Sequence, residues 1–90
     1  MNYGKKEPLV QTSLTNQFEL YPNPANRYLE LDGDFTAIKT IKLLDFMGRT
    51  VGMYQPTDQI AIEGLVEGVF LLIIELKTGI NEHHKVYIQH

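Results

Sequence analysis

The sequence predicts an all-β domain built from seven short strands. Turn signals recur along the chain, the segments between them alternate apolar and polar residues, and no segment shows a convincing 3.6-residue period. The longest apolar run, Val69 to Ile74, lies between a glycine-bounded turn and Lys77-Thr78-Gly79, which predicts a central strand with apolar side chains covered on both faces. Together these observations favour a seven-stranded antiparallel β-sandwich with an immunoglobulin-like layout.

Length, charge and composition exclude several classes of protein. A chain of 90 residues makes one domain, and a hydrophobic fraction of 43% is enough for a single core. The net charge is −3, with lysine and arginine scattered, which argues against a nucleic-acid partner. The absence of cysteine excludes disulfides, thiolate nucleophiles and cysteine-bound metals. The longest apolar run is six residues, far below the ~20 that a membrane-spanning helix needs.

The expected strands follow one another between turn signals. They cover residues 18–21, 27–31, 40–45, 50–54, 59–62, 69–76 and 83–89. The side chains expected to face the core are Leu29, Leu31, Ile41, Leu43, Ile60, Ile62, Val86 and Ile88, with Leu65 capping the core.

The first residues differ from the rest of the chain. Residues 1–17 are polar without a clean period and are expected to be a linker or tail from an upstream domain, while residues 18–90 form the domain proper. No apolar segment follows the lysines at the N-terminus, so no signal peptide is predicted there. The chain is therefore expected to be either cytoplasmic or a piece of a longer exported protein.

Two turns carry specific residues. In the segment Tyr21 to Asn26, Pro22 and Pro24 each fix φ and remove a backbone donor, and Asn23 can bond its own backbone two residues on, so this segment predicts a stiff corner. Gly48 can supply the positive φ of a tight hairpin between the third and fourth strands.

A third turn signal, Asp32-Gly33-Asp34, has two interpretations. The two aspartates could be calcium ligands. However, the oxygen-rich loop that ends in a bidentate acid is missing, which favours turn chemistry over a metal site.

No segment has the pattern of a catalytic centre. Ser13, the only serine, lies in the tail without a Gly-x-Ser-x-Gly elbow, and the glycines are spread one per turn instead of forming a phosphate loop. His83 and His84 are adjacent on a strand and should point to opposite faces, so one metal would need Glu82 or His90 as a further ligand. The sequence therefore predicts no enzyme, no cofactor and no metal site.

The tyrosines leave one alternative open. Tyr28, Tyr54 and Tyr87 are expected at outward positions and could form a carbohydrate-binding platform, although single exposed aromatics are normal on sheets. The alternative function is thus a non-catalytic surface β-sandwich that binds carbohydrate or protein.

Four segments carry motifs in a fixed order. They are the Y-P-N-P-A sequence from Tyr21 to Ala25, the I-x-L-x-D-x-x-G-R hairpin from Ile41 to Arg49, the segment from Ile62 to Phe70, and the lysine-led strand from Lys85 to Gln89. In this order they resemble the type A C-terminal sorting domain of the Bacteroidetes type IX (Por) secretion system. One departure is Val66, where the family's L-x-x-G-x-Y/F segment usually has proline after the leucine. The resemblance runs from about Phe18 to Gln89.

The resemblance implies a seven-stranded immunoglobulin-like sandwich at the end of a larger cargo protein, acting as an export address. Its partners would be the outer-membrane type IX translocon, which recognises the folded domain, and a sortase-like protease, which cuts upstream and commonly attaches the cargo to surface lipopolysaccharide. The cargo would pass through the periplasm to the cell surface or the medium. The cleavage region is expected between Met1 and Gln17, and the domain itself would catalyse nothing.

The residues expected to carry recognition or to hold the motifs in place belong to these segments. They are Tyr21, Pro22, Asn23, Pro24, Gly48, Leu65, Gly68, Phe70, Lys85, Val86, Ile88 and Gln89. For the glycines, a structural role is favoured over contact with the translocon. For Lys85 and its strand the two roles are balanced, because an exposed edge strand offers unpaired backbone groups to a partner or to a second copy.

Overall fold

The computed structural model describes residues 17–90, and it contains the seven predicted strands. Most bounds agree with the prediction to within one or two residues, and that of the fourth strand agrees fully. The elements in chain order are β1 (Glu19–Tyr21), β2 (Tyr28–Asp32), the 3-10 turn η1 (Phe35–Ala37), β3 (Ile38–Leu44), β4 (Thr50–Tyr54), β5 (Gln59–Ala61), β6 (Gly68–Leu76) and β7 (Asn81–Ile88).

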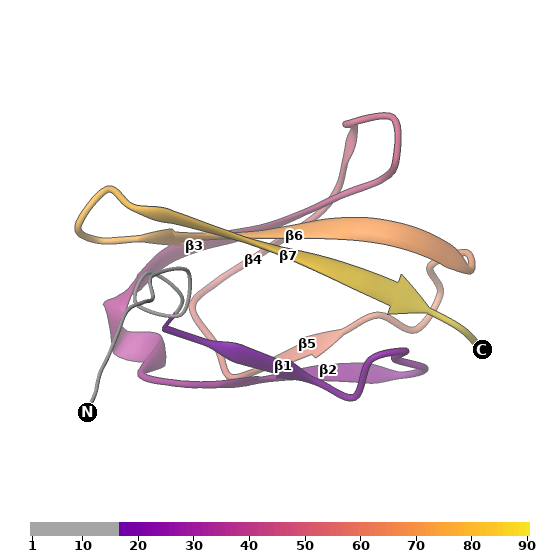
Figure 1. Cartoon of the computed structure of the whole chain (residues 1–90), viewed down its shortest axis with the longest axis horizontal. Helices are drawn as coiled ribbons and strands as arrows, with labels where there is room; N and C mark the ends of the chain where they lie inside the picture. The colour runs from indigo at the N-terminus through magenta and orange to yellow at the C-terminus, as the bar shows by residue number, and fades with distance from the viewer. Residues whose placement is uncertain (1–16) are drawn as a thin grey trace, which may run out of the picture.

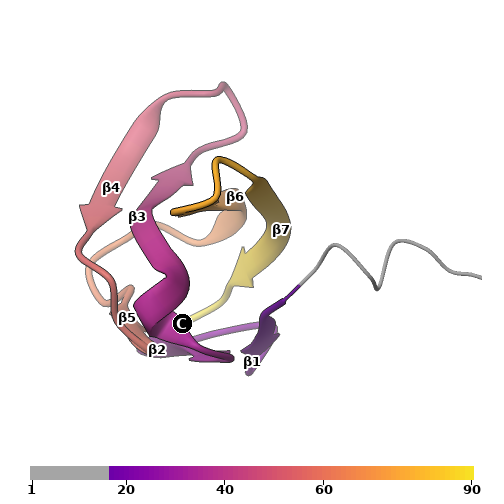
Figure 2. The same ribbon diagram turned by 90° about the vertical axis from the view of Figure 1, so that its left-hand side faces the viewer.

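The strands form two antiparallel sheets that face each other (Figures 1 and 2). The smaller sheet has the order β1-β2-β5 and the larger has the order β4-β3-β6-β7. The chain changes sheet after β2, after β4 and again after β5, so the smaller sheet is complete once β5 is added and the larger sheet only once β7 is added. The prediction that β6 is central is confirmed, because it pairs with β3 on one side and β7 on the other.

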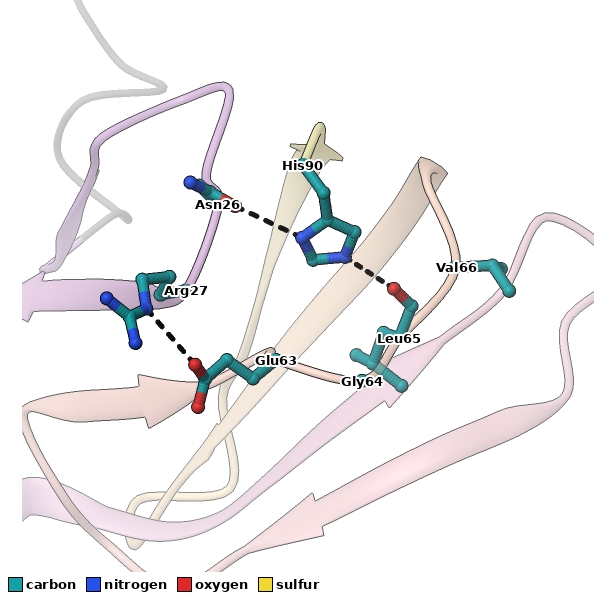
Figure 3. A pocket seen from close by; sticks show the side chains of 7 residues that line it. All are labelled: Asn26, Arg27, Glu63, Gly64, Leu65, Val66 and His90. Atoms are coloured by element: carbon teal, nitrogen blue, oxygen red, sulfur yellow. Dashed lines mark hydrogen bonds and ion pairs between the residues drawn. The ribbon is translucent and has the colours of Figure 1, made fainter.

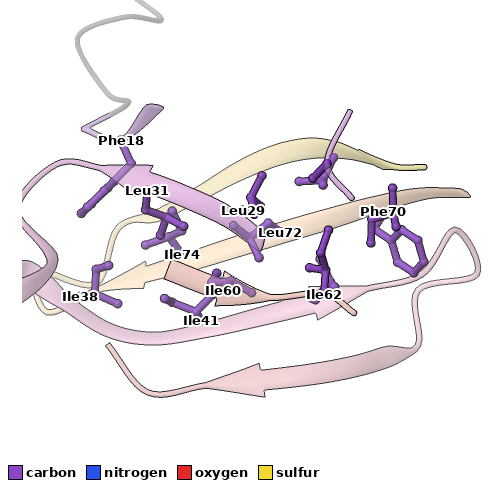
Figure 4. Close-up of a cluster of buried hydrophobic side chains, with 14 of the residues drawn as sticks. Phe18, Leu29, Leu31, Ile38, Ile41, Ile60, Ile62, Phe70, Leu72 and Ile74 are labelled. Carbon is purple, nitrogen blue, oxygen red and sulfur yellow. The ribbon is translucent and has the colours of Figure 1, made fainter. Parts of the chain in front are cut away.

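One apolar core fills the space between the sheets (Figure 4). All eight side chains predicted to face inward are buried, and Leu65 packs against them, partly buried, as expected. Each fully buried leucine or isoleucine contributes about 1.5–3 kcal/mol relative to an exposed one. The buried apolar residues are Phe18, Ala25, Leu29, Leu31, Ile38, Ile41, Leu43, Ile60, Ile62, Phe70, Leu72, Ile74, Leu76, Val86 and Ile88.

The expectation that β6 is covered on both faces is wrong. Phe70, Leu72 and Ile74 are buried, but Leu71 and Ile73 between them are only half-buried. Within residues 17–90 no further layer lies over the larger sheet, so cross-strand neighbours are all that shields its outer side. The apolar run therefore reflects a central position within a sheet, without a second covering layer.

The 3-10 turn between β2 and β3 was not predicted. Asp34 caps it by accepting from the backbone N–H and the hydroxyl of Thr36. The hydroxyl bond, followed by the backbone bond, lowers the pKa of Asp34 below its ordinary value. Its carboxylate thus serves turn chemistry, and among the described residues no group of three acidic or histidine side chains is arranged to hold a metal ion. The described part of the chain also has no helix long and apolar enough to cross a membrane.

Candidate recognition site

The four motif segments, far apart in sequence, meet at one end of the sandwich (Figure 1, right-hand end). We define this motif end as residues 21–26, the β3–β4 hairpin at residues 45–49, the β5–β6 loop at residues 62–67, and residues 85–90. Hydrogen bonds join the first and last of these segments, and the hairpin and the β5–β6 loop line a common pocket.

The corner at Tyr21 to Asn26 lies along the outer edge of β7. Asn23 Oδ1 accepts from the Tyr87 N–H at 2.9 Å, and Asn23 Nδ2 donates to the Lys85 carbonyl at 3.2 Å. Ala25, fully buried, donates to the Tyr87 carbonyl at 2.7 Å and accepts from the Gln89 N–H at 2.8 Å. The Tyr21–Pro22 and Asn23–Pro24 peptide bonds, on either side of Asn23, are cis. The corner therefore continues the sheet by a short parallel bridge.

This arrangement corrects the expectation of an unpaired edge at the last strand. Asn23 and Ala25 occupy the outward backbone groups of Tyr87, one of those of Lys85 and the N–H of Gln89. A partner could extend the sheet along this stretch only by displacing the corner. What this stretch leaves accessible is its exposed side chains, those of Lys85, Tyr87 and Gln89.

The β5–β6 loop is tied to the end of the chain. His90 Nε2 lies 2.6 Å from the Leu65 carbonyl, and the His90 N–H donates to Glu67 at 3.0 Å. His90 Nδ1 lies 3.1 Å from Asn26 Oδ1, which links the corner to the same cluster (Figure 3). Asn26, Leu65 and His90 line an open pocket of about 430 Å³ together with the Arg27–Glu63 ion pair, whose atoms are 3.1 Å apart.

The β3–β4 hairpin is organised by one carboxylate. Asp45 accepts from the N–H groups of Met47 and Arg49, both at 2.9 Å, and from Arg49 Nε at 2.8 Å. The backbone bond from Arg49 is the main cause that lowers the pKa of Asp45 below its ordinary value. Gly48 has φ +84°, which confirms the positive φ predicted for the tight turn.

The hairpin presents apolar side chains beside the β5–β6 loop. Phe46 is 85% exposed at the tip, and Val66 is 76% exposed on the loop opposite. Between them lies a pocket of about 390 Å³ whose lining includes Val69 and the buried Phe70. Gly68, at the start of β6, has φ +153°, a positive value that disfavours other residues.

The predicted recognition residues divide into two groups. Phe70, Val86 and Ile88 are core residues, and Gly48 and Gly68 hold turn geometry. The predicted residues with exposed side chains at the motif end are Tyr21, Pro22, Asn23, Pro24, Lys85 and Gln89, while Leu65 packs partly buried against the core.

The three tyrosines do not form one platform. Tyr28 lies on the outer side of the smaller sheet and Tyr87 on the outer side of the larger one. The outward placement expected for Tyr54 is wrong, because Tyr54 pairs with the inward-facing Ile41 and packs partly buried against the core. Burial raises its pKa above the ordinary tyrosine value. A Cβ added at Gly52 would come within 2.7 Å of the Tyr54 hydroxyl, so the glycine makes room for this ring.

The histidine pair behaves as expected on a strand. His83 points outward and His84 inward, which confirms that the two do not face the same site. His84 Nε2 lies 3.1 Å from Glu82, the one buried polar or charged residue among residues 17–90. Glu82 also accepts from the backbone N–H of Gln17, where the chain enters the domain. The sequence analysis missed this role, although the spacing of Glu82 from Val86 and Ile88 places it on the inward face.

Fold and site together define a small β-sandwich domain whose motifs form a surface of loops and strand ends. A family model described as "Secretion system C-terminal sorting domain" (Por_Secre_tail) matches residues 19–89. The chain therefore belongs to the family of type IX secretion C-terminal sorting domains, which is a family of secretion signals and not a known family of enzymes. No curated protein and no solved structure matches the chain.

Proposed function

We propose that this chain is the export address of a larger cargo protein, and that the type IX machinery reads it as a folded domain at the motif end. The observation that carries the proposal is the family match over residues 19–89, together with the gathering of all four motif segments at one end. Membership of the family indicates a cargo protein, the type IX secretion machinery, and export to the cell surface or beyond. Transit through the periplasm is part of the proposal.

The proposal also covers the processing of the cargo. A sortase-like protease would cut within residues 1–17 and attach the released cargo to the cell surface. Two contacts support a domain boundary at Phe18: its side chain is 3% exposed within the core, and the Gln17 N–H is held by the buried Glu82. Cleavage after Phe18 would remove part of the core, whereas cleavage before Gln17 would leave the domain intact.

We further infer an immunoglobulin-like layout. In the usual lettering, β1, β2 and β5 correspond to strands A, B and E. The larger sheet then has the order C′-C-F-G, in which β4 is strand C′. Variable-type sandwiches likewise have strand C′ in the sheet of C, F and G.

The deciding experiment is export of a reporter. Residues 18–90 are placed behind a signal peptide and a fluorescent protein in a host with a type IX system, and fluorescence is measured in the periplasm, on the cell surface and in the medium. We expect export that depends on residues 85–90, because their removal takes Val86 and Ile88 out of the core. A reporter that stays in the periplasm would show the sorting proposal to be wrong.

A further inference from the structure

The outer side of the larger sheet has an apolar centre, with Lys42 of β3 on one side and Lys85 of β7 on the other. The strand register places Lys42, Ile73 and His83 in one cross-strand row, with Met53 of β4 at its end. Alternation along each strand directs these side chains away from the core. Lys42 and His83 are exposed, while Ile73 between them is half-buried.

The next two rows extend the apolar surface toward the motif end. Leu44, Leu71 and Lys85 form the second row, and Val69 and Tyr87 the third. Val69 and Tyr87 are each 44% exposed. We call these three rows the lysine face, which comprises Lys42, Leu44, Met53, Val69, Leu71, Ile73, His83, Lys85 and Tyr87.

The charge of the lysine face is opposite to that of the whole chain. The chain carries a net charge of −3, yet the lysine face has two lysines and no carboxylate. Glu75 lies in the adjacent row, on the side away from the motif end, and lines one pocket with Lys42 and Ile73, but its carboxylate is contacted by Thr40 and Lys39 at 2.8 and 3.9 Å. Among residues 17–90 no carboxylate lies within ion-pair distance of Lys42 or Lys85.

The other sheet has the reverse pattern. Strands β1, β2 and β5 contain no lysine or arginine, and Glu19 lies directly opposite Asp32 on their outer side, with Glu30 beside them. Like charges directly opposite each other are destabilising, so this face is not arranged for fold stability alone. The domain is therefore polarised, with an acidic side and a basic, apolar side.

This polarity restricts what can cover the lysine face. A symmetric dimer through this face would place the lysines of one copy near those of the other, at a like-charge cost. The acidic side of a second copy offers carboxylates for a head-to-tail contact, but only tyrosines and a small alanine as apolar surface. The charge pattern favours a different partner, with carboxylates around an apolar strip.

We propose that the lysine face is the surface on which the domain docks to a protein of the export machinery, and that this protein presents carboxylates around an apolar strip. The inference rests on the sorting function proposed above and specifies its contact surface. Leu71 and Ile73 supply apolar area to bury, and Lys42 and Lys85 fix the orientation through complementary charge. Through Tyr87 and Val69 the face is continuous with the motif end.

The test is charge reversal in the reporter assay. Lys42→Glu, Lys85→Glu and the double variant are compared with the matched control Lys77→Glu, which lies in the β6–β7 turn outside the lysine face. We expect the double variant to reduce export roughly tenfold and the control to leave it unchanged. Urea unfolding of each purified 90-residue chain checks that the exposed substitutions leave the fold intact. Lys42→Arg with Lys85→Arg should retain export.

A second measurement identifies the partner. A photo-crosslinking residue replaces Met53 on the lysine face or, as a control, Tyr28 on the opposite side. We expect the Met53 position to capture a machinery protein at an acidic segment, and reversal of those carboxylates to lysine should restore export of the double variant. The control position should not capture that segment.

The outcomes separate this inference from the sorting function. If the unchanged domain fails to direct export, the sorting function is wrong. If the unchanged domain is exported and the folded double variant is exported equally well, the lysine face is not the docking surface. Two further results would also overturn the inference: lysine-dependent self-association of the purified chain in sedimentation, and lysine-dependent binding to phosphatidylglycerol–phosphatidylethanolamine vesicles.

Discussion

At the scale of single residues, the Asn23 side chain joins the corner to β7 through two hydrogen bonds. It stands between two prolines, neither of which has a backbone N–H, so its own side chain supplies the donor and the acceptor that β7 requires. The donor contacts the Lys85 carbonyl and the acceptor contacts the Tyr87 N–H. A carboxamide can do both at once, whereas a carboxylate can only accept.

This difference gives a prediction for two substitutions. Asn23→Ala removes both hydrogen bonds and should lower the free energy of unfolding by about 1–2 kcal/mol. Asn23→Asp keeps the shape but brings a negative charge toward the Lys85 carbonyl, and it should destabilise the domain at least as much. Urea unfolding followed by far-ultraviolet circular dichroism measures both values. An Asn23→Asp variant as stable as the original would show that the bond to Lys85 is unimportant.

Sequence reasoning at this scale worked where alternation is clear. Leu29 and Leu31 were predicted to face inward because polar residues separate them, and both are buried. Tyr54 was misplaced because its strand, Thr50–Tyr54, has apolar residues at alternating and adjacent positions and contains a register shift opposite Leu43 and Leu44. Which side of such a strand faces inward is decided by the partner strand, and a single strand's pattern does not contain that information.

At the scale of elements, the β3–β4 hairpin depends on the ionised form of Asp45. Three N–H donors point at this carboxylate, and its pKa in the folded protein is lowered. A lowered pKa means that the folded state favours the charged form. The resulting stability is present above the pKa of the unfolded chain, whose ordinary value is 3.8, and is lost as the pH falls through the folded value.

We therefore predict a pH-dependent effect of Asp45→Asn, which removes the charge and retains the size. The variant should unfold at a lower urea concentration than the original at pH 7, and the difference should shrink as the pH falls below about 4. The other carboxylates titrate in both proteins, so the difference between the two urea midpoints reports on Asp45. A difference that stayed constant between pH 7 and pH 3 would contradict this role.

The pairing of elements shows the limit of sequence reasoning. The corner and the last strand were each recognised, but nothing in the sequence predicted that they contact each other, since the Asn23 bonds span more than 60 residues. The contact uses backbone groups of β7, which are the same for every residue type except proline. For this reason the same strand was expected to offer a free edge.

At the scale of the whole molecule, the motif end exists only after the chain has folded completely. The corner belongs to the first third of the domain and its partner β7 is the last strand. The larger sheet places β7 beside β6, and β7 then supplies both the core residues Val86 and Ile88 and the edge that holds the corner. A machinery protein that binds the assembled motif end would therefore bind only the folded domain.

This dependence predicts that loss of stability alone reduces export. Gly68→Val should cost more than about 1 kcal/mol because φ is +153° at this position. Ile74→Ala should cost about 2–5 kcal/mol because it leaves a cavity in the core away from the motif end. Small domains have a free energy of unfolding of about 5–15 kcal/mol. Ile74→Ala removes a larger share of it than Gly68→Val and should therefore reduce reporter export more strongly.

The deciding comparison plots reporter export against the measured free energy of unfolding for the two variants and for Lys77→Glu, a control at an exposed turn position. If the machinery reads the folded end, export follows stability regardless of where the substitution lies, and Ile74→Ala, which touches no exposed residue of the motif end, is the more severe. A Gly68→Val protein that unfolds at the original urea concentration and still fails to export would instead make Gly68 a contact for the machinery. An Ile74→Ala protein that is largely unfolded but fully exported would show that a linear segment, and not the assembled end of the sandwich, is the address.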